Sequence, residues 1–347
     1  MMLEISEIDH VDEMGLYRDY EAWPEHFLKA MQLQTDFSLP SKPVGVICAG
    51  MGGSGSSCDL VVNWATPNSK IPLIVWKDHD LPSFVGKDWV AIAVSLSGNT
   101  NETFSSLKAA SKSGAHTIGI SSGGMFEDFC GDNGIEYLKT PILKTPRSSL
   151  PYLAATLSKI FTNIEQLDVS KEDLTNTAED MVKMRNEVGV NVNFGENPAK
   201  KLASEIYTGI PLIYVSPKLR PVATRFQDSL NENAKMHALV DSIPELCHNE
   251  LESWRKTESE HYRTILLQEL GEEIGIRHRF TFLRDLIESA GGKHYDVEAK
   301  GRCHFGMLFS TIYFLDYVSI YTAILRKVDP TPTHNIDRLK ELLSSNY

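Results

Sequence analysis

The sequence predicts an α/β protein of two domains, each with a mainly parallel sheet flanked by helices. Three observations support this prediction. The chain has 347 residues, which is more than one ordinary hydrophobic core holds. Strand-like and helix-like segments alternate through both halves, as in parallel sheets covered on both faces. The composition, 42% hydrophobic and 23% charged, is that of a globular protein. We expect residues 1–160 to form N-terminal helices and a first domain, and residues 161–347 a second.

The elements of the first domain follow from the spacing of apolar residues. One or two helices are expected over residues 12–34, around Pro24. Helices are also expected at residues 102–113, where apolar side chains recur at helical spacing, and at residues 150–164. Near-continuous apolar runs predict strands at residues 44–49, 72–76, 89–95, 116–120 and 135–138.

The second half repeats this order of elements after a polar connector helix expected at residues 175–188. Strands are expected at residues 211–216, 262–268 and 293–298. Helices are expected at residues 199–207, 221–238, 308–325 and 335–343. The turn after the first of these strands, Ser216-Pro217-Lys218, lacks the glycines of its counterpart in the first half. We therefore expect the first domain to bind a ligand and the second to support it.

Composition and charge disfavour several classes of protein. A net charge of −12 disfavours nucleic acid, whose binding needs basic patches. No apolar run approaches the roughly 20 residues that span a bilayer, and the acidic start lacks the order of a signal peptide. The five Cys residues, among them Cys48 inside a strand, never occur as Cys-x-x-Cys, so reduced thiols are expected. A cytoplasmic protein with neither a membrane nor a nucleic-acid partner is expected.

Two loops that follow predicted strands suggest a binding site for phosphate. Residues 44–49 lead into Gly50-Met51-Gly52-Gly53-Ser54-Gly55, and residues 89–94 lead into a loop with Ser95, Ser97 and Thr100. Each loop opens a predicted helix, whose free backbone N–H groups attract anions. Hydroxyl groups add donors for the several acceptor oxygens of a phosphate monoester. Two such loops at one point predict a phosphate monoester site.

The same residues allow other interpretations. The pattern Gly50-x-Gly52-x-x-Gly55 also fits the Rossmann fingerprint, and Asp78 lies near the position of a ribose-binding acid. An NAD(P)-dependent oxidoreductase is therefore an alternative. The absence of a Walker A lysine disfavours a nucleoside triphosphatase. The hydroxyls could also be simple helix caps, although capping explains one or two of them rather than the whole set.

Several segments resemble the sugar isomerase (SIS) domain, and more specifically the bifunctional phosphoglucose/phosphomannose isomerases. In the first half these are residues 50–55, 95–103 and 145–152. In the second half they are residues 219–223, 231–235, 244–250, 315–319 and 328–340. The match covers nearly the whole chain in order, although Leu96 stands where the family often has Tyr and Cys247 where it often has Asn. The resemblance implies two SIS-type α/β/α sandwich domains, with a C-terminal helix that returns to the active site.

The resemblance implies an enzyme that interconverts glucose 6-phosphate and mannose 6-phosphate with fructose 6-phosphate through a cis-enediolate. By resemblance, Glu232 is the base that moves the proton between C1 and C2, and Arg147 is the cation that stabilises the enediolate. His248 is the acid/base that opens the sugar ring and comes from the neighbouring subunit of a homodimer. Lys340 assists at the ring oxygen. The implied substrate-binding residues are Gly53, Ser54, Ser95, Ser97, Thr100 and Thr333.

Each of these residues also has an ordinary structural explanation. Glu232, Arg147 and Lys340 could be solvated surface residues, and His248 could be a structural histidine. The 11 His residues include no His-x-x-x-His pair, so no metal is expected, and the resemblance implies no cofactor. A phosphosugar-sensing SIS module without catalysis remains a second alternative to the enzyme.

Overall fold

The computed structural model describes residues 3–35, 37, 39–40, 42–143, 145–256 and 259–344. Contacts divide the chain into two compact units. The first-sheet unit consists of residues 22–183 and 300–310, and the second-sheet unit of residues 1–21, 184–299 and 311–347. The proposed division into domains after residue 160 stays a prediction.

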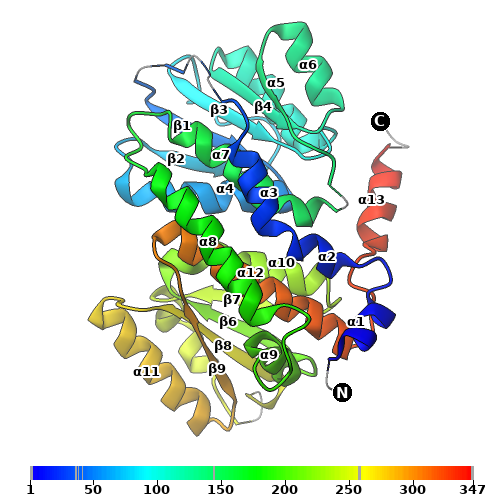
Figure 1. The fold of residues 1–347 in the computed structure, drawn as a ribbon. Coiled ribbons are helices and arrows are strands. Elements are labelled where there is room, and N and C mark those ends of the chain that lie inside the picture. Colours follow the sequence, from blue (N-terminus) through cyan, green and yellow to red (C-terminus); the bar gives the residue numbers. More distant parts are fainter. Residues whose placement is uncertain are drawn as a thin grey trace. The chain divides into compact units, whose positions relative to one another are not determined.

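The first-sheet unit contains a parallel sheet of five strands in the order β2-β1-β3-β4-β5 (Figure 1). These strands are β1 (Gly45–Ala49), β2 (Leu73–Trp76), β3 (Trp89–Val94), β4 (His116–Ser121) and β5 (Glu136–Lys139). All five were predicted, within a residue or two at each end. The central strands β1 and β3 are buried along their whole length, and their register pairs Ile47 with Ala91. A strand covered on both faces needs a continuous run of apolar residues, and such runs allowed these strands to be predicted from the sequence.

Helices cover both faces of this sheet. Figure 1 shows α4 (Gly52–Ala65) on one face and α5 (Asn101–Ser113) with α6 (Met125–Asn133) on the other. The chain leaves β1 through α4 toward β2, and leaves β3 through α5 toward β4. These connections run in opposite directions, so β1 and β3 flank the topological switch point of the sheet. Ligands of open α/β sheets bind outside the carboxyl ends of the strands at such a point.

Two more helices, α3 (Trp23–Met31) and α7 (Leu150–Phe161), pack together in this unit, and α7 also packs on α4. The ring of Phe27 lies 5.5 Å from that of Phe309, in an edge-to-face arrangement. Cys48, in the middle of β1, is fully buried. Burial raises the pKa of its thiol well above the usual value, as expected for a cysteine that packs as a small core residue.

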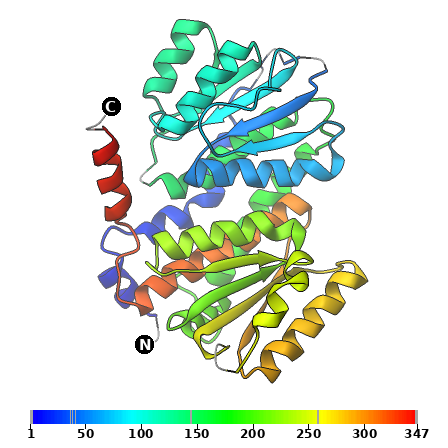
Figure 2. The same cartoon turned by 180° about the vertical axis from the view of Figure 1, so that it is seen from behind.

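The second-sheet unit contains a parallel sheet of four strands in the order β7-β6-β8-β9. These are β6 (Ile210–Val215), β7 (Leu239–Ser242), β8 (Tyr262–Glu269) and β9 (His294–Ala299). Strand β7 was not predicted, because a helix was expected to run to residue 238. That helix, α10 (Arg220–Glu232), ends six residues earlier. Figure 2 shows α10 and α11 (Ile274–Ser289) on opposite faces of the sheet.

The remaining helices are α1 (Ile5–Val11), α2 (Leu16–Glu21), α8 (Lys171–Val188), α9 (Pro198–Ile206), α12 (His304–Leu325) and α13 (His334–Ser344). Helix α12 corrects one expectation, because it is long and apolar enough to cross a bilayer by length and composition. Its apolar window is 89% buried inside the structure, as in the core helix of a folded protein.

Candidate active site

The glycine loop joins β1 directly to α4. The N–H of Gly50 donates to the carbonyl of Trp76 at 3.1 Å, and α4 begins two residues later at Gly52. A Cβ atom on Gly55 would lie 2.7 Å from the carbonyl oxygen of Gly50. Residue 55 must therefore be glycine for the start of α4 to lie this close to the end of β1. No side chain caps the start of α4, which leaves its first N–H groups for an anion.

The second loop follows β3 and leads into α5. Its backbone is tightly folded, since Gly98 has φ +67° and an added Cβ would overlap the carbonyl oxygen of Gly123 at 1.8 Å. Inside the loop, the Ser95 hydroxyl donates to that of Thr100 at 3.0 Å, and the Asn99 N–H donates to the Ser97 hydroxyl at 3.3 Å. Ser97 is exposed, whereas Ser95 is buried.

The structure brings these two loops together at the switch point. The N–H of Leu96 donates to the hydroxyl of Ser54 at 3.3 Å, which links the first turn of α4 to the loop after β3. A Cβ on Gly50 would lie 3.1 Å from the carbonyl oxygen of Val94, so the two strand ends are in close contact. The hydroxyl groups and the starts of α4 and α5 therefore surround one place at the carboxyl edge of the sheet.

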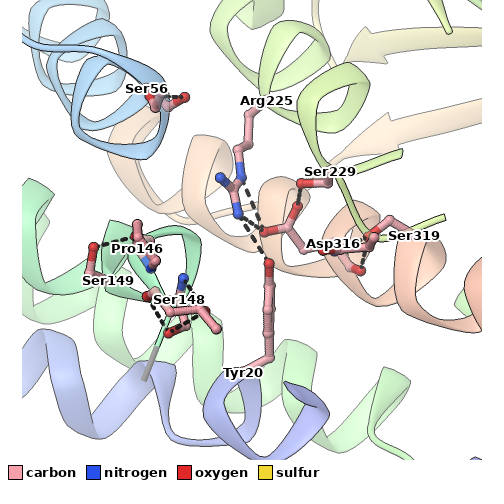
Figure 3. Close-up of polar contacts among 12 residues, drawn as sticks. Tyr20, Ser56, Pro146, Ser148, Ser149, Arg225, Ser229, Asp316 and Ser319 are labelled. Carbon is pink, nitrogen blue, oxygen red and sulfur yellow. Dashed lines mark hydrogen bonds and ion pairs between the residues drawn. The ribbon is translucent and has the colours of Figure 1, made fainter. Parts of the chain in front are cut away.

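Arg147 lies against the same turn of α4. It belongs to a 3₁₀ turn, η2 (Pro146–Ser149). Two hydrogen bonds hold this turn (Figure 3): the Ser148 N–H donates to Thr145 Oγ1 at 3.3 Å, and the Ser149 hydroxyl donates to the Pro146 carbonyl at 2.5 Å. A Cβ on Gly53 would lie 3.2 Å from that carbonyl and 3.5 Å from Arg147 Cα. Arg147 is 4% exposed, so the alternative of a solvated surface arginine is wrong.

Glu232 and Thr333 belong to the second-sheet unit, where Lys235 connects Glu232 to Pro330, three residues before Thr333. Glu232 is the last residue of α10 and is half-buried. The Lys235 ammonium donates to the carbonyl of Glu232 and to that of Pro330, the latter at 3.2 Å. Thr333 follows three residues later and its hydroxyl donates to Asp337 at 3.4 Å at the start of α13. The segment before α13 is thus held beside the end of α10.

His248 and Lys340 lie on exposed parts of the second-sheet unit. His248 ends a 3₁₀ turn, η4 (Glu245–His248), that is anchored by the buried Leu246. Two residues further on, the Tyr214 hydroxyl donates to Glu250 at 2.7 Å. Lys340 lies on α13. Among the residues that the structure describes, neither the His248 imidazole nor the Lys340 ammonium makes a hydrogen bond or ion pair.

A buried cluster on α10 and α12, close to Glu232 along the chain, was not predicted from the sequence. Asp316 of α12 is fully buried and pairs with Arg225 of α10 at 2.9 Å. The signal was present in the sequence, because Asp316 is the single Asp, Glu, Lys or Arg in the 22 residues of α12. A carboxylate that is kept in an apolar helix needs a charged partner. The partner lies 91 positions away, which the sequence does not reveal.

The described residues include no group of three or more His, Cys, Asp or Glu side chains placed to hold a metal ion. Near the glycine loop, the Lys77 ammonium instead pairs with Asp59 of α4 at 2.5 Å. Burial raises the pKa of Asp59, and the charge of Lys77 acts against that rise. The chemistry available at the switch point is therefore hydrogen bonding to an anion by neutral donors, with the buried guanidinium of Arg147 beside it.

Comparisons with known proteins identify the family of the chain. A family profile described as "Bacterial phospho-glucose isomerase C-terminal SIS domain" matches residues 195–343. A bifunctional phosphoglucose/phosphomannose isomerase of Caldicellulosiruptor bescii is 30% identical over 330 residues, which cover 92% of this chain and 96% of that protein. One from Thermoplasma acidophilum is 32% identical over 302 residues, 86% of this chain and 89% of that protein. The structure of a glucose-6-phosphate isomerase like protein from Thermus thermophilus superposes with a TM-score of 0.62 at 21% identity. The superposition covers 96% of this chain and 98% of that one, and it supports the fold.

Proposed function

Because the chain belongs to the family of bifunctional phosphoglucose/phosphomannose isomerases, we propose that it interconverts glucose 6-phosphate and mannose 6-phosphate with fructose 6-phosphate. One observation carries the proposal: two donor loops meet at the switch point of a sheet in a chain that matches these isomerases along nearly its whole length. The NAD(P) alternative rested on the glycine pattern and on the position of Asp78. Matches of this extent to isomerases favour the phosphosugar.

The phosphate of the substrate binds at the meeting point of the two loops. The N–H groups at the start of α4 and the hydroxyls of Ser54, Ser97 and Thr100 supply its hydrogen bonds. Neutral donors at two helix starts suit a dianion, because the helix dipoles add partial positive charge to the hydrogen bonds. Anchoring by phosphate holds the sugar at the end remote from the reacting carbons, and that binding energy orients C1 and C2.

The reaction moves a proton between C2 of the aldose and C1 of the ketose. Glu232 removes the proton from C2 of the open-chain aldose and returns it to C1, while the hydroxyl proton of the C2 oxygen passes to the C1 oxygen, so that the carbonyl moves from C1 to C2. Glucose 6-phosphate and mannose 6-phosphate differ at C2 alone, so both give the same planar enediolate. Arg147 stabilises the negative charge that develops on the oxygens. One base in one pocket then serves both epimers.

The test of this proposal supplies fructose 6-phosphate and measures both aldose phosphates with separate coupled assays. We expect both products, and each aldose phosphate should competitively inhibit turnover of the other with an inhibition constant near its own KM. A chelator should leave both rates unchanged, since the proposed chemistry uses side chains alone. Formation of neither aldose phosphate would overturn the proposal, and noncompetitive inhibition would overturn the shared pocket.

Replacing Ser54 with alanine should weaken binding of every phosphorylated substrate. The Ser54 hydroxyl joins the two loops at 3.3 Å and faces the anion in our proposal, so its loss removes a hydrogen bond to a charged group. Such a bond is worth about 1.5–3 kcal/mol, which corresponds to a KM increase of about 10- to 100-fold with a smaller change in kcat. Ser113→Ala is the matched control, because that hydroxyl donates to the Ala110 carbonyl at the far end of α5. Equal KM values in the two variants would contradict the phosphate site.

We infer further that the enzyme is a cytoplasmic homodimer in which His248 completes the site of the partner and opens the sugar ring. The exposed imidazole on an anchored turn supports this inference.

Mixing two inactive homodimers, Glu232→Gln and His248→Asn, tests this sharing of residues. If His248 acts across the interface, each mixed dimer has one intact site and one doubly altered site. Random exchange of subunits should then restore about one quarter of the wild-type activity. If His248 acts within its own subunit, no mixed dimer has an intact site, and the mixture stays inactive. Mixing each variant with itself is the control.

A further inference from the structure

A buried ionic cluster joins α10 and α12 in the second-sheet unit. The Asp316 carboxylate accepts hydrogen bonds from Arg225 Nη2 at 2.9 Å, from Arg225 Nε at 3.3 Å and from the hydroxyl of Ser229. Arg225 Nη2 also donates to the hydroxyl of Tyr20 at 3.1 Å (Figure 3). Arg225 is 2% exposed and Asp316 is fully buried. A pair in such surroundings is structurally costly unless its hydrogen bonds are satisfied, as they are here.

The cluster fixes the last two turns of α10, which end at Glu232. Arg225, Ser229 and Asn233 are four residues apart and therefore lie along one face of the helix. All three are tied to the same turn of α12, since Asn233 Nδ2 donates to the Ser319 hydroxyl at 2.8 Å and that hydroxyl donates to the Asp316 carbonyl at 2.7 Å. Glu232 precedes Asn233, so its backbone is set by this clamp.

The charges of the cluster also act on the Glu232 side chain. Burial would lower the pKa of Arg225, but Asp316 and Tyr20 outweigh this and raise it, and Glu232 adds a smaller contribution in the same direction. Burial raises the pKa of Asp316. Arg225 and Ser229 lower this pKa, whereas the charge of Glu232 raises it further. Arg225 from its own helix and Asp316 from α12 are thus two of the charged groups that act on Glu232. Lys235 in the following turn binds the Glu232 carbonyl.

We propose that Asp316 is a positioning residue for Glu232, which it serves by neutralising Arg225 and by holding the end of α10. The inference rests on the proposed role of Glu232 as the base. With Asp316 ionised, the Arg225–Asp316 pair carries no net charge, so its net electrostatic attraction for the Glu232 carboxylate is small. Without that negative charge, an isolated buried guanidinium would act on the base, favour its ionised form and make it a poorer proton acceptor.

Asp316→Asn tests this proposal, because the amide keeps the shape of the side chain and one acceptor oxygen but removes the charge. The acidic limb of the pH profile of kcat/KM should move to lower pH by about one unit, since Arg225 is now uncompensated. We expect kcat to fall by about 10- to 100-fold and KM for glucose 6-phosphate to change little. The double variant Arg225→Gln/Asp316→Asn restores a neutral pair and should return the acidic limb to its wild-type position.

The control is Asp180→Asn in the first-sheet unit, where Asp180 binds Arg302 Nε at 2.9 Å and is 9% exposed. It removes a similar ion pair and should lower thermal stability without moving the acidic limb. If Asp316→Asn does not fold, the double variant still tests the proposal, since removing both charges together leaves no unpaired charge in the core. Wild-type kcat and an unmoved limb in folded Asp316→Asn would overturn the proposal, as would a shifted limb in the double variant.

The same assays separate this proposal from the proposed function. If the wild-type chain does not isomerise either aldose phosphate, the proposed function fails, and this inference with it. If the wild-type chain is active and Glu232→Gln is not, while Asp316→Asn behaves like wild type, the positioning role alone is wrong.

Discussion

Glu232→Gln is expected to lower kcat for both aldose phosphates by about 10²–10⁴-fold, while phosphosugar affinity stays near the wild-type value. The amide is almost the same size as the carboxylate but accepts no proton at neutral pH. The phosphate loops belong to β1, α4, β3 and α5, none of which contains Glu232, so binding of the phosphate should persist. Turnover is measured with the coupled assays, and affinity by calorimetric titration with fructose 6-phosphate.

Glu288→Gln provides the control for this variant. Glu288 lies on α11 and pairs with His294 at 3.0 Å on the surface, where such pairs contribute little. Its kcat should equal that of the wild type. Full activity of Glu232→Gln would remove the base from the mechanism. Loss of affinity as well as turnover would instead make Glu232 a binding residue. A non-catalytic sensing module would bind the phosphosugar but show no turnover in the wild type, and Glu232→Gln would change nothing measurable.

Arg147→Gln should produce the second large effect, a fall in kcat of about 10²–10³-fold with a smaller change in KM. The guanidinium is buried beside the first turn of α4, so its charge acts on the enediolate with little screening by water. Arg147→Lys keeps the charge but loses the planar set of donors and should recover a part of the activity. Rates on both aldose phosphates and thermal unfolding are measured together, because loss of a buried side chain also affects stability.

Arg302→Gln is the matched control for Arg147, since Arg302 pairs with Asp180 and Glu179 in the same unit. It should change thermal stability rather than kcat. If Arg147→Gln and Arg302→Gln lower the unfolding temperature equally and leave kcat unchanged, Arg147 has a structural role only.

The first sheet could be predicted from the sequence almost completely. Its central strands are covered on both faces and so consist of continuous apolar residues, and glycine and hydroxyl residues follow each at its carboxyl end. Alternation with helices predicted that the strands are parallel, but the strand order comes from the structure. The site at the switch point is predictable for the same reason, because parallel strands bring their carboxyl ends to one edge.

The second sheet was harder to predict because its edge lacks those signals. Strand β7, Leu239-Val240-Asp241-Ser242, is a short edge strand that is half exposed and half polar, and it follows α10 after only six residues. In the first-sheet unit, helix α6 was not predicted either, because it buries only Phe126 and Cys130, too few to show a period. The Arg225–Asp316 pair depends on two helices packing together, which no local pattern contains.

The most direct test of the central claim is a crystal structure of Glu232→Gln with glucose 6-phosphate bound. We predict that the phosphate lies at the carboxyl ends of β1 and β3, with its oxygens within about 3.2 Å of the hydroxyls of Ser54, Ser97 and Thr100 and of the N–H groups at the start of α4. A phosphate bound elsewhere on the chain, with these donors facing water, would contradict the claim.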